Sequence, residues 1–293
     1  MAINNKTKKI KPFEELELKD DFMFRAVMTN PELCKECLER IMNIKIKELR
    51  YPQSEVNMDS SAYTKGIRID VYTEGDGVVY DIEMQPVLKK DIPQRSRYYQ
   101  SKIDFNNLKP GDKYSELKNN VVIFIGLNDL FGEGRHKYTF ENRCVENPDI
   151  RLKDGTTKIF LNAFGTLMDI SYDLEVFLNY IATGIVSDDY TKQLNDEVNI
   201  VRSNEKWRSD YMTMQTLLIE EHEEGKREER EENIRNLLIE GMDYKFITRI
   251  TKATTEEIRS IESAITQEDR ELYFKENGGS IADAGHGVGF GMK

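Results

Sequence analysis

The sequence lacks the features that mark a membrane, secreted or disulfide-stapled protein. Its 293 residues contain no apolar run near the roughly 20 residues that a bilayer-spanning helix needs. The chain has only three cysteines, and this small, odd number argues against a disulfide framework and fits a reducing compartment. Residues 1–11 are polar and lysine-rich, unlike a secretory signal. We therefore expect a cytoplasmic protein that has no membrane segment.

Histidine and paired soft ligands are scarce as well. His136, His222 and His286 have no neighbouring partner at ligand spacing, which disfavours a catalytic histidine. Cys34 and Cys37 form a CxxC, but a second pair of soft ligands is missing, and the same spacing suits one face of a helix. The sequence therefore does not favour a zinc or redox centre.

Negative charge is abundant but unevenly placed. The net charge is −11, yet residues 1–150 carry 24 Lys and Arg against 25 Asp and Glu, whereas residues 151–293 carry 18 against 28. Eight glutamates fall between residues 220 and 232. The overall charge therefore does not exclude a local phosphate-binding face in the first half.

Apolar periodicity in the first two thirds of the chain predicts an α/β fold. Residues 13–42 have helical spacing, which Asn30 and Pro31 divide into two helices. The remaining expected elements are a β-hairpin at 66–85, a helix at 92–108, a strand buried on both faces at 121–125, short strands at 138–140 and 158–162, and a helix at 174–185. This order predicts a mixed sheet flanked by helices.

A helical region is expected to follow. Residues 195–240 predict a long charged helix, and residues 242–264 predict two short helices with Thr254 or Thr255 as the N-cap of the second. Six glycines among the last eighteen residues predict a disordered tail. We expect domains at 1–190, 191–275 and 276–293.

The sharpest chemical feature is a set of acids in the predicted hairpin. Alternate residues of a strand share a face, so Asp81, Glu83 and Gln85 lie on the same side. A turn centred on Gly75 and Asp76 would pair Asp70 near Asp81 and diagonally close to Glu83. Converging carboxylates repel one another and need a cation, for which hard oxygen ligands select Mg²⁺ or Mn²⁺. A solvated hairpin face would show the same alternation, so spacing leaves both interpretations open.

Several motifs in order resemble those of one nuclease family. Asp70-Val71 followed by Ile82-Glu83-Met84-Gln85 resembles the "DV…iEmQ" signature of the PD-(D/E)XK nuclease family transposases, also called the Rpn family of recombination-promoting nucleases. Further segments resemble the neighbouring motifs of that family, namely the segments 21–25, 95–99, 108–114 and 121–125. Together the motifs extend over about residues 15–165.

The resemblance implies a restriction-endonuclease-like core that cuts DNA with Mg²⁺, with Mn²⁺ as a substitute. It implies that Asp70 and Glu83 bind the metal and that Asp21 is a further catalytic acid from the first helix, for which helix capping is the alternative. Gln85 stands where the broad superfamily has lysine. An amide there could orient a water, but it supplies no positive charge.

Four basic residues are candidate DNA contacts in this family frame. Arg25 stands where the family often has lysine, and Lys102 belongs to a basic cluster near the exit of the hairpin. Arg95 and Arg97 carry guanidinium forks that suit phosphate. A solvated helix face, or a salt bridge to Glu83 or Asp81, is the alternative for both.

The leading hypothesis is therefore a Mg²⁺-dependent DNA endonuclease. The alternative is a catalytically weak nuclease-fold protein that binds DNA or a partner through its C-terminal helices, because the chain is acidic and lacks the superfamily lysine. Residues 234–261 resemble a helix-turn-helix bundle, but Glu256 and Glu257 open its second helix and would repel phosphate. A protein-binding role or a homo-oligomer through the C-terminal helices is favoured for that region.

Overall fold

The computed structural model describes residues 11–50, 53–58 and 67–277 of the chain. These residues fall into two packing units, Met1–Tyr211 and Met212–Lys293. Most of the predicted tail, from residue 278 onwards, lies outside the described part. Within the described part, no helix is both long and apolar enough to cross a membrane.

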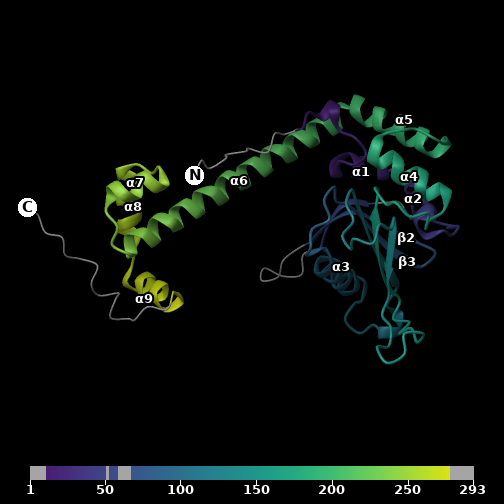
Figure 1. The fold of residues 1–293 in the computed structure, drawn as a ribbon, viewed down its shortest axis with the longest axis horizontal. Helices are drawn as coiled ribbons and strands as arrows, with labels where there is room; N and C mark the ends of the chain where they lie inside the picture. Colours follow the sequence, from purple (N-terminus) through teal and green to yellow (C-terminus); the bar gives the residue numbers. More distant parts are fainter. Residues whose placement is uncertain (1–10, 51–52, 59–66, 278–293) are drawn as a thin grey trace, which may run out of the picture. The chain divides into compact units, whose positions relative to one another are not determined.

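A mixed sheet forms the centre of the first unit (Figure 1). Its six described strands lie in the order β1-β2-β3-β4-β6-β5. The β3–β4 and β4–β6 pairs are parallel and the other pairs antiparallel, which confirms the predicted mixed sheet. The bounds are β1 (Gln53–Met58), β2 (Ile67–Gly75), β3 (Val78–Met84), β4 (Asn119–Gly126), β5 (Lys137–Phe140) and β6 (Thr156–Asn162). Strand β1 was not predicted.

The predicted hairpin is formed by β2 and β3, but its turn is one residue later than expected. Asp76 and Gly77 occupy the turn with φ angles of 48° and 80°, the left-handed conformations that a type I′ turn requires. Val71 therefore pairs with Ile82, and Tyr72 rather than Asp70 lies opposite Asp81. Because the partner shifts by two residues, the predicted face of each side chain is unchanged.

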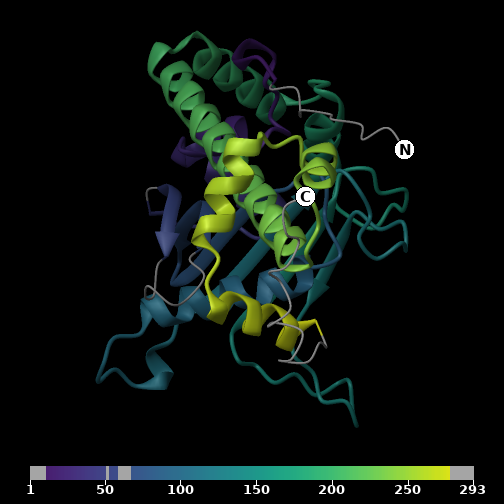
Figure 2. The same cartoon turned by 90° about the vertical axis from the view of Figure 1, so that its left-hand side faces the viewer.

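Strand β3 lies deep in the sheet, between β2 and β4, and is buried on both faces. One face is covered by α3 (Ile92–Asn107), whose Tyr99 and Ile103 pack with Val79 and Phe124 in one apolar cluster. The uninterrupted strand predicted at 121–125 is likewise completely buried. Figure 2 shows the strands side by side. Polar residues on the α3 face of β3 are therefore removed from bulk solvent.

Four helices of the first unit pack on one another (Figure 1). They are α1 (Asp21–Met28), α2 (Pro31–Met42), α4 (Tyr172–Thr183) and α5 (Asp189–Ser203), and two single turns accompany them, η1 (Phe13–Glu15) and η2 (Tyr114–Glu116). As predicted, Asn30 and Pro31 separate the first two helices, because the Asn30 side chain accepts from the Glu32 and Leu33 amides. Cys34 and Cys37 both lie buried on α2.

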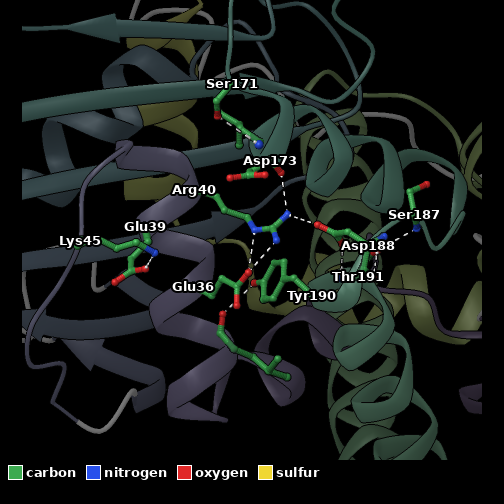
Figure 3. Close-up of polar contacts among 12 residues, drawn as sticks. Glu36, Glu39, Arg40, Lys45, Ser171, Asp173, Ser187, Asp188, Tyr190 and Thr191 are labelled. Carbon is green, nitrogen blue, oxygen red and sulfur yellow. Dashed lines mark hydrogen bonds and ion pairs between the residues drawn. The ribbon is translucent and has the colours of Figure 1, made fainter.

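An arginine of α2 ties these helices together (Figure 3). Arg40 donates to the Asp188 carboxylate at 2.7 Å, to the Asp173 carbonyl at 2.9 Å and to Glu36 at 2.7 Å. Its guanidinium also lies over the Tyr190 ring at 4.4 Å. These contacts place α5 in the first unit, so the boundary predicted at 190 falls inside a helix of that unit.

The single long helix predicted at 195–240 is two helices. Asn204 separates α5 from α6 (Glu205–Ile239), and its side-chain oxygen accepts from the Lys206 amide at 2.9 Å. The first turns of α6 belong to the first unit, because Trp207 and Tyr211 pack on the Phe22 ring at 6.0 and 5.1 Å. An Asn cap inside a periodic helical pattern is the reason the break was missed.

The second unit is helical throughout its described residues. The end of α6 packs on α7 (Tyr244–Thr251) and α8 (Thr255–Ala264) around a small core, and α9 (Gln267–Glu276) follows. That core consists of Ile234, Leu238, Ile247, Ala253 and Ile258. Thr254 caps α8 as predicted, since its hydroxyl accepts from the Glu257 amide.

Candidate active site

The Asp70 and Glu83 carboxylates each accept a hydrogen bond from the backbone of the opposite strand, at the point where the pairing of β2 with β3 ends. The last paired residues are Val71 and Ile82, and one step further Asp70 comes to lie opposite Glu83. There the Asp70 amide donates to Glu83 Oε1 at 3.0 Å, and the Met84 amide donates to Asp70 Oδ2 at 3.1 Å. The two acids are 4% and 0% exposed. The carboxylates thus take the place of carbonyl acceptors and hold this end of the hairpin.

Arg95 from α3 is the counter-charge of Glu83. Its Nη2 donates to Glu83 Oε2 at 2.9 Å, and its Nε donates to the Tyr99 hydroxyl at 2.9 Å. The guanidinium also lies 4.9 Å from the Tyr99 ring centre and 5.7 Å from that of Phe124. The salt bridge to Glu83, an alternative of the sequence analysis, is therefore present, and the arginine side chain is one third exposed.

Arg25 from α1 stands on the other side of the site. It is 2% exposed, and its Nε lies 3.9 Å from Asp70 Oδ1. Its Nη2 lies 3.8 Å from Asp21 Oδ1. The N-cap of α1 is Asp20, while Asp21 is the first residue of the helix. Asp70 and Glu83 are therefore two adjacent acids with an arginine on either side, Arg25 from α1 and Arg95 from α3, and Asp21 lies beyond Arg25.

Asp81 is a third acid of this sheet face that the predicted site did not include. It is 0% exposed, and neither carboxylate oxygen has a hydrogen-bond partner among the described residues. Burial, and then the charge of Asp70, raise its pKa well above the usual range of aspartate. Burial also raises the pKa of Glu83, and the charges of Asp81 and Asp70 add to that effect. Its spacing of two from Glu83 was the signal that could have placed Asp81 in the site.

Negative charge is in excess at this site. Four carboxylates, Asp21, Asp70, Asp81 and Glu83, stand against the guanidinium groups of Arg25 and Arg95. The surplus of two charges and the hard oxygen donors fit one divalent cation. Among the described residues, no three His, Cys, Asp or Glu side chains are already arranged as a metal-binding group, and Glu83 accepts hydrogen bonds from the Asp70 backbone amide and from Arg95.

The remaining predicted site residues differ in exposure. Gln85 follows β3 and is half-buried. Its backbone amide donates to the Ile125 carbonyl at 2.9 Å, so the strand direction continues to it. Arg97 is exposed on α3. Lys102 is only 6% exposed, with its ammonium 5.4 Å from the Tyr98 ring centre. The structure thus brings Asp21, Arg25, Asp70, Glu83 and Arg95 together, while it buries Lys102 further along α3.

Comparison with protein families places about half of the chain in a known family. The family described as PD-(D/E)XK nuclease family transposase matches residues 18–164, which is half of the chain and includes every residue of the acidic site. Neither curated proteins nor solved structures give a significant match. The mixed sheet with flanking helices agrees with a PD-(D/E)XK nuclease-like fold.

Proposed function

The chain belongs to the PD-(D/E)XK nuclease family transposases, and from that premise we propose that it is a Mg²⁺-dependent DNA endonuclease of the recombination-promoting type. The observation that carries the proposal is the pair Asp70 and Glu83, two buried carboxylates fixed opposite each other at the end of a hairpin. Buried ionised carboxylates destabilise a fold unless positive charge, such as that of a bound cation, compensates them. PD-(D/E)XK nucleases generally use divalent metals.

In this proposal Asp70 and Glu83 hold the cation, and Mn²⁺ would serve in place of Mg²⁺. When bound, the cation lowers the pKa of a water and offsets charge on the phosphate. Arg25 keeps the Asp70 carboxylate in place from one side, and Asp21 in turn orients Arg25. Asp21 therefore acts as a positioning residue.

Gln85 is proposed to orient the attacking water through its amide. Two residues beyond Glu83 on a continuing strand, its side chain lies on the same face as that acid. Because an amide carries no charge, stabilisation of the phosphate falls to the cation and to Arg95, whose partly exposed guanidinium lies at Glu83.

DNA contact is proposed at the exposed end of α3. Arg97 is exposed there, and Lys89 and Lys90 are exposed just before the helix. The burial of Arg25 and Lys102 does not suit direct phosphate contact, so we assign both to support of the fold around the site. The local basic surface is therefore small, which predicts weak binding without the cation and a shallow salt dependence, because few phosphates are neutralised.

Cleavage of supercoiled plasmid with Mg²⁺ or Mn²⁺ tests the proposal. Asp70→Asn and Glu83→Gln keep the acceptors of the two backbone bonds while removing charge, so the fold is retained. Glu74→Gln is the matched control, an acid of the same strand whose partners are Lys118 and Arg50 outside the site. We expect nicking by wild type and Glu74→Gln and a loss of at least about 100-fold in the two site variants. Equal activity of all four proteins would contradict the proposal.

The second candidate function is binding through the C-terminal helices. One contact in these helices favours a protein partner over DNA. Glu257 accepts from the Thr254 amide at 2.7 Å and so places a carboxylate at the N-terminal end of α8. That end would face the phosphates in a helix-turn-helix complex, and the carboxylate would repel them.

Self-association is the protein contact that we propose for this unit. The middle of α6 exposes four large apolar residues, Met212, Leu217, Leu218 and Ile219, and two copies would also supply one active site for each DNA strand. Light scattering should give a dimer mass for the full chain and a monomer mass for Leu217→Glu with Leu218→Glu. Ile250→Glu, an exposed apolar residue of α7, should leave the mass unchanged. A monomeric wild-type chain would contradict self-association.

A further inference from the structure

Asp81 is the one exception to hydrogen-bond satisfaction in the described part of the chain. Its two oxygens are the only buried side-chain nitrogen or oxygen atoms there that have no partner. The residue lies in the middle of β3, between Tyr72 of β2 and Val122 of β4, and is completely buried. Buried polar groups are almost always paired, and a buried charge is costly unless it is compensated.

The fold does satisfy an acid of α3 itself, Asp104. Asp104 is half-buried, and its Oδ1 accepts from the side-chain Nδ2 of Asn120 at 2.7 Å. Asn120 in turn accepts from Gln100 at 3.0 Å, so a complete polar network surrounds Asp104. The absence of such a network at Asp81 is therefore a property of its position beside Asp70 and Glu83.

The charged neighbours of Asp81 offer it no donor. Asp70 acts on it from β2 and Glu83 from its own strand, and both are acids. Arg95 is the only cation among them, and its guanidinium already donates to Glu83 and Tyr99. Tyr99 faces the site from α3, and its hydroxyl accepts from Arg95 but makes no hydrogen bond to Asp81. A contact between the Asp81 and Glu83 carboxyls needs a shared positive group, which is either a proton or a metal ion.

Building on the proposed function, we propose that Asp81 is a third carboxylate ligand of the divalent cation held by Asp70 and Glu83. Asp81 is completely buried and neither of its oxygens has a protein donor among the described residues, whereas Glu83 accepts from the Asp70 backbone amide and Arg95, and Asp70 accepts from the Met84 backbone amide. Binding of a cation by Asp81 also accounts for the surplus of two negative charges at the site. The residue is a cation ligand and does not touch DNA.

Calorimetric titration of the full chain with Mn²⁺ tests this assignment without using activity. Asp81→Asn removes the charge from a nearly isosteric side chain, and Asp104→Asn, on the helix that covers Asp81, is the matched control. We expect Asp81→Asn to weaken Mn²⁺ affinity by about tenfold or more, which is the scale for loss of a metal-site group. Asp104→Asn should stay within about twofold of wild type, and Glu83→Gln should lose binding.

The outcomes separate this inference from the proposed function. Wild-type affinity in Asp81→Asn together with lost binding in Glu83→Gln would overturn the inference alone, and Asp81 would then hold a proton. Failure of the wild-type chain to bind Mn²⁺ would overturn the proposed cation site and this inference together. The Mn²⁺-induced rise in melting temperature gives the same comparison independently, and Asp81→Ser serves as a second variant in both measurements.

Discussion

Acidic side chains are concentrated in two regions of this molecule, and the two regions treat them in opposite ways. On β2 and β3, Asp70, Asp81 and Glu83 are buried, with the guanidinium groups of Arg25 and Arg95 beside Asp70 and Glu83. On α6, eight glutamates lie between residues 220 and 232, and all of them are exposed to solvent. The second region holds eight acids against three basic residues, which leaves five of the eleven net negative charges of the chain, yet all of these acids are open to solvent. We therefore expect the functional chemistry at the buried acids of β2 and β3, although α6 carries more acidic residues.

The directions of the pKa shifts express the same contrast. Burial raises the pKa of Asp81, so its ionised form opposes folding. In the helical unit, the hydrogen bond from the Thr254 amide lowers the pKa of Glu257, and the charge of Arg230 adds to this, so ionisation favours folding. A buried acid in the first unit and an exposed acid in the second thus give stability the opposite dependence on pH.

Removing one arginine from each region should produce the largest difference between them. Arg25→Ala leaves Asp70 without its nearby cation and opens a cavity, so the free energy of unfolding should fall by about 3 kcal/mol. Arg227→Ala removes an exposed ion pair with Glu224 and should change it by less than about 0.5 kcal/mol. Urea denaturation of both variants measures the two values. Equal effects would remove the distinction between the regions.

A smaller effect is expected from the titration of Asp81. A carboxyl whose folded pKa is raised supports stability fully below its unfolded pKa of about 3.9 and loses that support as the pH rises through the folded value. At pH 8, the free energy of unfolding of Asp81→Asn, measured by urea denaturation, should therefore exceed that of wild type by more than about 1 kcal/mol. The gain should shrink towards pH 4. Chelator must be present, and a gain that is independent of pH would contradict the assigned burial cost.

The smallest effect is expected at Glu257, with the opposite sign. Because its folded pKa is lowered, its contribution is present at neutral pH and is lost as the pH falls through the folded value. Glu257→Gln should therefore lower the melting temperature slightly at pH 7 and leave it unchanged near pH 3. Thermal melts at both pH values check this. A larger loss in acid than at neutral pH would exclude the assignment.

The sequence predicted the elements whose pattern repeats locally. The buried strand at 121–125 and the hairpin follow from composition and a period of two, and the face shared by Asp81 and Glu83 follows from the same period. The hairpin register was wrong by two residues because Asp76 and Gly77, rather than Gly75 and Asp76, take the left-handed turn positions. The acids still fell on one face, since a shift of two preserves it.

The rest depended on contacts between distant segments. Strand β1 is short and mostly polar, with only Val56 and Met58 as alternating apolar residues, and it pairs with β2 along its length, so the local pattern was too weak to predict it. The contact of Arg95 with Glu83 depends on the packing of α3 over the sheet, which spacing alone does not determine. For the same reason, the sequence could not show that Asp81 lacks a partner, because that requires knowledge of every side chain around it.

The most direct test of the account compares the two acidic regions in one cleavage assay. Supercoiled plasmid with Mg²⁺ is treated with wild type, with Glu83→Gln and with a variant in which Glu228, Glu229, Glu231 and Glu232 of α6 are glutamine. The account predicts that the single substitution at Glu83 abolishes nicking, while the four substitutions on α6 retain it. Nicking that survives in Glu83→Gln and is lost in the α6 variant would contradict the account.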